Sequence, residues 1–169
     1  MAKQSISYSE IYKQIRERKF LIEYNKSKKE LIIEFDNIRL PTLNEILSGL
    51  QYRKFEIWNY KKTVKEVMAD ILTQLKEKVN KEYLFENGVD LYIYRRGKKI
   101  IDNDSLPACF KYFIDSFTLN NIIKDDSPDY IKNIKCFQEK GEPKFILKLK
   151  ETDYKQPKIK TPIDFMREL

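Results

Sequence analysis

Residues 102–117 read DNDSLPACFKYFIDSF, and this stretch decides how the middle of the chain folds. On a helical wheel at about 100° per residue, one side of the stretch is apolar and the opposite side is charged. The apolar side consists of Leu106, Phe110, Phe113, Ile114 and Phe117. The charged side consists of Asp104, Lys111 and Asp115. We therefore expect an amphipathic helix over residues 105–118 with its apolar side in the core.

The sequence on either side of this helix predicts an α/β (α+β) fold. Apolar or alternating runs bounded by turn residues indicate strands over residues 20–24, 31–35, 89–95, 129–138 and 144–150. Apolar residues at helical spacing indicate further helices over residues 7–19 and 57–78. The main part of the chain follows the order β-α-β-α-β-β, which we expect to form a mixed sheet with two main helices. An N-terminal helix precedes it.

The length favours one compact domain with an extension at each end. The chain has 169 residues, of which 41% are apolar and 13% aromatic, and this apolar content excludes an intrinsically disordered protein. We divide it into an N-terminal helical and hairpin extension (1–30), a central domain (31–150) and a polar C-terminal tail (151–169). There is neither an apolar run long enough to span a membrane nor a signal peptide, so we expect a soluble cytoplasmic protein.

The net charge and the amino-acid composition limit the classes of function that the chain can have. The chain has 33 Lys and Arg against 26 Asp and Glu, and the net charge of +7 favours an anionic partner such as nucleic acid. A lysine-rich composition without functional meaning is the alternative. The chain has no histidine, which excludes His-dependent catalysis and imidazole-bound zinc. We expect its two cysteines, Cys109 and Cys136, to be small buried hydrophobic residues.

Three aspartates are candidates for a metal site. Asp102 and Asp104 precede the expected helix, and the segment after that helix is long enough to bring Asp126 back to its N-terminal end. Three converging carboxylates need a cation, and oxygen ligands suit Mg²⁺ or Mn²⁺, which can activate water for phosphodiester hydrolysis with Lys111 nearby. The alternative is structural, with Asp102 or Asp104 capping the helix and Asp126 lying in a turn.

Four motifs follow one another at characteristic spacing. They are Pro41-Thr42-Leu43-Asn44-Glu45, Asp102-x-Asp104, Lys111-x-x-x-Asp115-x-Phe117 and Asp125-Asp126. Their order, together with the expected β-α-β-α-β-β layout, resembles the RusA family of Holliday-junction resolvases, which are small endodeoxyribonucleases of phages and prophages. The resemblance covers about residues 31–150.

The resemblance implies a RusA-like fold and a set of site residues. The divalent metal would be bound by Asp102, Asp104 and Asp126, and Lys111 would be the catalytic lysine. The residues expected to support them are Asp115, Asp125 and Ser105, with Asp115 one helical turn from Lys111. A four-way junction has two-fold symmetry and is cut at two symmetric positions, which requires two active sites. We therefore expect a homodimer. The resemblance also implies a phage or prophage protein in a bacterial host.

Basic and polar residues outside this site are candidates for DNA binding. They are Asn44, Arg53, Lys54, Lys61, Lys62, Lys65, Arg95, Arg96, Lys98 and Lys99. The aromatic residues Tyr52, Phe55 and Trp58 lie close to Arg53, Lys54, Lys61 and Lys62 in the sequence. We expect Phe55 and Trp58 to lie in the core, and the alternative is an aromatic side chain that wedges into a DNA branch point.

Three functions are compatible with these features. The first is a Mg²⁺-dependent endodeoxyribonuclease that resolves Holliday junctions or other branched DNA by paired nicks. The second is a catalytically inactive DNA-binding protein, or a phage-encoded inhibitor that recruits a protein partner through the C-terminal tail. It is motivated by Ser105, where the family usually has Asn. The third is a structural or interaction protein whose charge is incidental.

Overall fold

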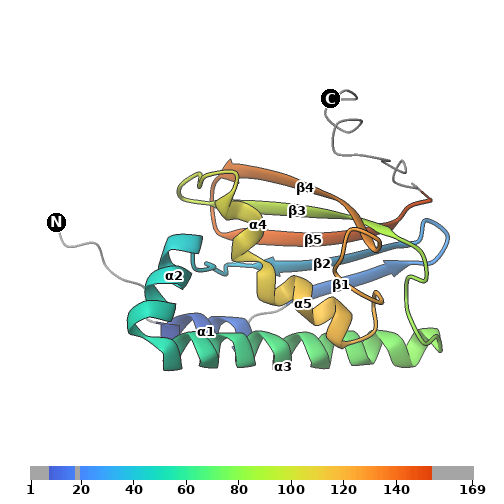
Figure 1. The fold of residues 1–169 in the computed structure, drawn as a ribbon, viewed down its shortest axis with the longest axis horizontal. Helices are drawn as coiled ribbons and strands as arrows, with labels where there is room; N and C mark the ends of the chain where they lie inside the picture. The colour runs from blue at the N-terminus through green and yellow to red at the C-terminus, as the bar shows by residue number, and fades with distance from the viewer. Residues whose placement is uncertain (1–7, 18–19, 154–169) are drawn as a thin grey trace, which may run out of the picture.

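The computed structural model describes residues 8–17 and 20–153 and folds them into a five-stranded sheet with helices packed against it (Figure 1). The helices are α1 (Tyr8–Glu17), α2 (Leu43–Tyr52), α3 (Lys54–Val79), α4 (Ser105–Cys109) and α5 (Lys111–Leu119). The strands are β1 (Phe20–Asn25), β2 (Glu30–Asp36), β3 (Val89–Gly97), β4 (Ile131–Lys140) and β5 (Lys144–Glu151).

The sheet is mixed, as the sequence predicts. Its strand order is β1-β2-β5-β3-β4, in which β3 and β4 are parallel and the other neighbouring strands are antiparallel. Because parallel strands need a crossover connection, the chain passes from β3 to β4 through α4 and α5. The α/β (α+β) class with a mixed sheet and several helices is therefore confirmed.

One face of the sheet and the helices form a single core. In β2, Leu31, Ile33 and Phe35 are buried and alternate with less buried residues, as expected for a strand with one covered face. The helix α3 contributes a stripe of buried residues at helical spacing, which are Ile57, Tyr60, Val64, Met68, Ile71 and Leu72. Figure 1 shows α3 running beside the sheet, and α1 and α5 pack against α3.

The expected helix over residues 105–118 is interrupted. Phe110 leaves helical geometry (φ −101°, ψ 3°) and separates α4 from α5. Its ring is fully buried and lies 5.3 Å from the ring of Phe145 in β5, measured between centroids. The interruption lets Leu106, Phe110 and Phe113 all reach the core, but one helical wheel no longer relates Asp104 to the residues of α5.

Two further elements differ from the sequence-based expectation. The helix α2 was not expected, although Thr42 and Glu45 after Pro41 have the spacing of a capping box. The helix α3 begins three residues earlier than the predicted position 57. The hairpin is confirmed, since β1 pairs with β2 from Phe20 opposite Phe35 to Asn25 opposite Glu30.

The two ends of the chain are described in part. Within the N-terminal helix predicted over 7–19, the described α1 runs from Tyr8 to Glu17, and positions 7, 18 and 19 lie outside the described residues. The expected tail (151–169) lies outside them from position 154 onward. Among the described residues, no helix is both long enough and apolar enough to cross a membrane.

Candidate functional site: a lysine-carboxylate cluster and a basic pocket

Lys111, at the first position of α5, joins two of the predicted carboxylates. Its Nζ atom donates to Asp115 Oδ1 at 2.6 Å and to Asp126 Oδ2 at 3.1 Å. Asp115 lies one turn further along α5, whereas Asp126 comes from the loop between α5 and β4. The structure therefore brings Lys111, Asp115 and Asp126 together, and we call these three residues the lysine-carboxylate cluster.

The loop that carries Asp126 is held by backbone bonds and buried side chains. The Ile122 amide donates to the Phe117 carbonyl at 2.8 Å, and the Phe85 amide donates to the Ile122 carbonyl at 2.9 Å. Ile122 and Ile123 are fully buried, so the loop is anchored against the core before it reaches Asp126. Just before it, Asn121 adopts a left-handed conformation (φ 53°) that turns the chain after α5.

The cluster keeps Lys111 charged. The hydrogen bond that Lys111 donates to Asp115 raises the pKa of Lys111, partial burial opposes this, and the hydrogen bond to Asp126 raises the pKa further. The folded protein therefore holds a protonated ammonium group through neutral and moderately alkaline pH. Such a group can stabilise negative charge on a phosphate, but it cannot act as a general base.

A hollow of about 330 Å³ lies beside the cluster. It is lined by Lys61, Lys65, Tyr112, Asp115, Thr118, Leu119 and Asp126. The Nζ atom of Lys61 lies 5.7 Å from the centre of the Tyr112 ring, which is a cation–π contact. Two of the lysines predicted to bind DNA are thus next to the cluster.

Asp102 and Asp104 lie in the turn that leads into α4. The amides of Ser105 and Leu106 donate to the Asp102 carbonyl, and the Ser105 hydroxyl is 3.5 Å from Asp104 Oδ1. Asp104 makes no side-chain capping bond. The β4 residue Gln138 holds the preceding residue through its side-chain amide, which bonds both the Ile101 amide and the Ile101 carbonyl.

The predicted metal ligands are not gathered at one point. Within residues 8–17 and 20–153, no three Asp, Glu or Cys side chains form a group that could hold a metal ion. The helix α4 and Phe110 separate Asp104 from Lys111 along the chain, and Asp126 accepts a hydrogen bond from Lys111. The oxygen donors suit Mg²⁺ chemically, but their arrangement in this conformation does not fit a bound ion.

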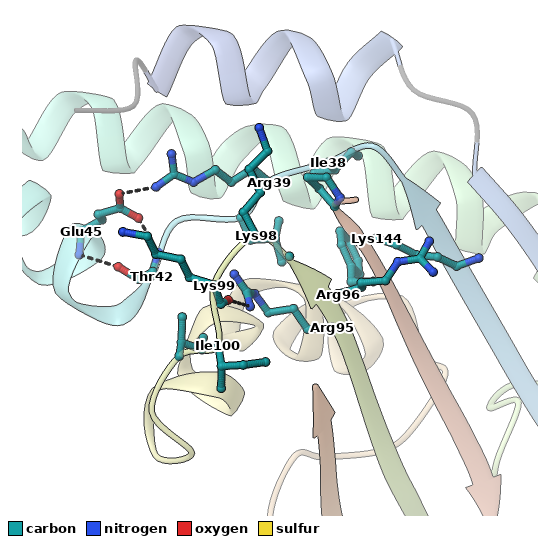
Figure 2. A pocket seen from close by; sticks show the side chains of 15 residues that line it. Ile38, Arg39, Thr42, Glu45, Arg95, Arg96, Lys98, Lys99, Ile100 and Lys144 are labelled. Atoms are coloured by element: carbon teal, nitrogen blue, oxygen red, sulfur yellow. Dashed lines mark hydrogen bonds and ion pairs between the residues drawn. The ribbon is translucent and has the colours of Figure 1, made fainter. Parts of the chain in front are cut away.

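A second, larger hollow of about 600 Å³ lies at the end of β3, next to the start of β5 and the segment before α2 (Figure 2). Six cationic side chains line it, which are Arg39, Arg95, Arg96, Lys98, Lys99 and Lys144. We call this hollow the basic pocket. The sequence predicts four of its cations but not Arg39 and Lys144, because they join the others only when β2, β5 and β3 pair.

The corner between α2 and α3 exposes aromatic side chains. Tyr52, Phe55 and Trp58 are 74%, 73% and 56% exposed, so the expectation that Phe55 and Trp58 lie in the core is wrong. The reason is the phase of α3, whose Ile57 and Tyr60 face the core instead. The Phe55 and Trp58 rings are stacked at 6.1 Å, and the Lys62 ammonium lies 5.4 Å from the Trp58 ring centre.

The remaining predicted DNA-binding residues near this corner are Asn44, Arg53, Lys54 and Lys65. Asn44, Lys54 and Lys65 are exposed, and Arg53 is half-buried and forms an ion pair with Glu56 at 3.3 Å. These residues belong to α2, to the α2–α3 junction and to α3, whereas Arg95 to Lys99 belong to the end of β3 and the following turn. The candidate DNA-binding residues therefore fall into two groups.

The two cysteines differ in their surroundings. Both have free thiols. Cys109 in α4 is buried, as predicted, and burial raises the pKa of its thiol to about 11. Cys136 is only half-buried because β4 is an edge strand of the sheet.

Comparison with known proteins adds no family assignment, since no family model matches the chain and no curated protein matches it. The lysine-carboxylate cluster and the basic pocket therefore carry the functional interpretation.

Proposed function

We propose that this protein is an endodeoxyribonuclease that binds branched DNA, such as a Holliday junction, and cuts it by paired nicks. One observation carries the proposal: Lys111 donates to both Asp115 and Asp126, which belong to separate RusA-like motifs and to separate segments, α5 and the loop that follows it. A lysine whose pKa is raised by two carboxylates, beside a hollow lined by further lysines, is suited to contact a phosphodiester.

The charge distribution supports DNA as the substrate. The chain carries a net charge of +7, and the basic pocket and the lysines of α3 concentrate cations at two places. DNA-binding proteins derive much of their affinity from neutralising phosphates with such cations, and this affinity falls with salt. The exposed, stacked rings of Phe55 and Trp58 lie near the lysines of α3, and such rings are suited to stack on an unpaired base.

The divalent ion is part of the proposal because Asp102, Asp104 and Asp126 offer oxygen donors that suit Mg²⁺ or Mn²⁺. In the present conformation Asp126 accepts a bond from Lys111 and the three carboxylates form no metal-holding group. A metal-bound state therefore requires a rearrangement of the turn before α4 or of the Asp126 loop. Calorimetric titration with Mn²⁺ tests this, and Asp104→Asn should weaken any binding.

A homodimer and a bacterial setting complete the proposal. Two symmetric nicks in a two-fold junction need two sites, which a C₂ dimer supplies. Because the motifs resemble those of a family found in phages and prophages, we propose that this is a phage or prophage protein that acts in the cytoplasm of its bacterial host. The C-terminal tail, beyond the described residues, is a proposed site for a protein partner.

The test is cleavage of a fluorescent synthetic four-way junction by the purified protein in Mg²⁺ or Mn²⁺. We expect symmetric nicks, loss of cleavage with retained binding for Asp104→Asn, and a decrease of about 10²-fold or more for Lys111→Met, which loses the ammonium group. Asp70→Asn, which removes an exposed carboxylate of α3, is the matched control and should cut normally. A junction that stays intact after long incubation contradicts the proposal.

The second candidate is a DNA-binding protein that does not cut. It is favoured by the lack of a metal-holding group among the described residues and by Lys111, which neutralises Asp126. It predicts junction binding that weakens steeply with salt and is unaffected by divalent ions. If the protein does not retard DNA even at low salt, both candidates fail and the charge is incidental.

A further inference from the structure

The basic pocket combines an apolar wall with a cationic rim. The apolar lining includes Ile100, which is exposed, and Ile101, which is half-buried, together with the buried side chains of Ile38, Leu40 and Phe145. The rim carries the six cations named above and a single carboxylate, Glu45 (Figure 2). A ligand that complements this pocket has an apolar body and a negative charge.

Three of the six cations, Arg95, Lys98 and Lys99, pair with no carboxylate in the part of the chain that the structure describes, and Arg95 is the half-buried one of the three. Arg39 is paired with Glu45 at 2.9 Å, Arg96 lies 3.9 Å from Glu139, and Lys144 is paired with Glu34. In the part of the chain that the structure describes, no carboxylate pairs with Arg95, and its Nη1 atom donates to the Lys99 carbonyl at 2.9 Å. Burial lowers the pKa of Arg95, so its charged form lacks part of its solvation.

The guanidinium of Arg95 is also held at a defined place. It folds over Gly97, the last residue of β3, where an added Cβ atom would lie 2.8 Å from Arg95 Nη2. The glycine therefore lets the guanidinium lie close to the backbone at the rim of the pocket. A Cβ atom at position 97 would force the guanidinium to shift from this place without removing its charge.

The shape of the pocket discriminates among anions. A volume of about 600 Å³ is that of a small-molecule pocket, larger than an inorganic phosphate needs. A paired duplex presents phosphates on its outside and keeps its bases stacked, so it would leave the isoleucine wall empty. A nucleotide released from the stack offers both a phosphate for the arginine and a flat base for the wall.

We propose that the basic pocket binds one unpaired nucleotide of a DNA strand, with its phosphate on Arg95 and its base against Ile100 and Ile101. This inference rests on the proposed function in taking DNA as the ligand. It makes an unpaired position, such as one at a branch point, the feature by which this protein selects its DNA.

The experiment compares three labelled hairpin duplexes that differ at one position. One is fully paired, one contains a single unpaired adenosine, and one contains an abasic nucleotide at the same place. Binding is measured by fluorescence anisotropy in EDTA at fixed salt, so cleavage does not contribute. We expect the unpaired adenosine to bind roughly tenfold more tightly than the paired duplex, which corresponds to burial of about 60 Å² of apolar surface against the isoleucines, and the abasic duplex to fall between them.

Two variants and one control link this preference to the pocket. Arg95→Gln removes the charge and should reduce the tenfold preference to about onefold. Gly97→Ala keeps every charge but forces the guanidinium to shift, so it should reduce the preference to a smaller extent. Lys28→Gln removes one exposed charge in the turn between β1 and β2, at the opposite end of β2, and should leave the preference intact.

The outcomes separate the inference from the proposed function. If all three duplexes bind equally, the protein does not prefer an unpaired position and the nucleotide pocket is overturned. If the abasic duplex binds as tightly as the adenosine duplex, the base makes no contribution and the pocket is overturned as well. Neither result bears on the nuclease. A preference that survives both Arg95→Gln and Gly97→Ala also overturns the nucleotide pocket. Junction cleavage that fails while the preference and its loss in the variants are observed overturns the nuclease alone. Failure to bind any of the three hairpin duplexes overturns the nucleotide pocket, and the nuclease is then judged by the junction-cleavage test alone.

Discussion

At the scale of single residues, the position of Lys111 depends on two different kinds of partner. Asp115 is local, because a spacing of four residues in a helix places the two side chains on one face. Asp126 is distant, because it reaches Lys111 only through the loop anchored by Ile122. The first partner could be predicted from spacing alone, whereas the second was not predicted, since the sequence-based expectation places Asp126 with Asp102 and Asp104.

The two thiols should react at very different rates in the native protein. With a pKa of about 11, only about one in a thousand Cys109 thiols is ionised at pH 8, and the residue is also buried. Absorbance after addition of a disulfide reagent at pH 8 should show one accessible thiol, Cys136, and a second only after denaturation. Cys136→Ser should remove the fast phase, and rapid reaction in that variant would contradict the burial of Cys109.

At the scale of elements, α2 shows how a short local motif can specify a helix that its apolar pattern does not reveal. The Thr42 hydroxyl accepts from the Glu45 amide at 3.3 Å, and the Glu45 carboxylate accepts from the Thr42 amide at 2.7 Å. Pro41 comes immediately before this capping box, at the end of the segment from β2. The Pro-Thr-x-Asn-Glu motif thus starts α2, and the ion pair of Glu45 with Arg39 links the helix to the basic pocket.

Removing this cap should destabilise the protein by a measurable amount. Thr42→Ala removes the hydroxyl that satisfies the Glu45 amide, and we expect the free energy of unfolding in urea to decrease by about 1 kcal/mol. Thr42→Ser retains the oxygen and should recover most of this difference. If Thr42→Ala unfolds at the same urea concentration as the unmodified protein, the capping box contributes nothing to stability.

At the scale of the whole molecule, an aromatic cluster connects the sheet to the helices that carry the site. The Phe35 and Phe145 rings are stacked at 4.7 Å across β2 and β5, and Phe113 of α5 contacts them edge-on at 5.9 Å and 5.2 Å. Phe113 is two residues from Lys111. The position of Lys111 therefore depends on packing between elements that are distant in the sequence.

Loss of the Phe113 ring should have a large effect on stability. The side chain is fully buried, so we expect Phe113→Ala to lower the free energy of unfolding by about 3–5 kcal/mol because it leaves a cavity in the core. Phe137→Ala, on the edge strand β4, removes a ring that is 54% exposed and should change stability by only about 0.5 kcal/mol or less. Urea unfolding followed by circular dichroism measures both. Equal effects of the two substitutions would contradict the proposed role of the cluster.

The sequence by itself determined the main helices and strands, the mixed α/β (α+β) class and the pairing of Lys111 with Asp115. These features follow from local periodicity and spacing, which a chain carries before it folds. It could not determine the interruption at Phe110 or the exposure of Phe55 and Trp58. The first depends on the fit of one buried ring, and the second on the exact phase of α3 against the sheet.

Only the tertiary structure decided which charges lie together. Arg39, Arg95 and Lys144 come from three segments that meet because β5 pairs with both β2 and β3. Asp126 reaches Lys111, while Asp102 and Asp104 lie in the turn before α4, with that helix between them and Lys111. Pairing and packing between distant segments set these distances, and composition alone contains no information about them.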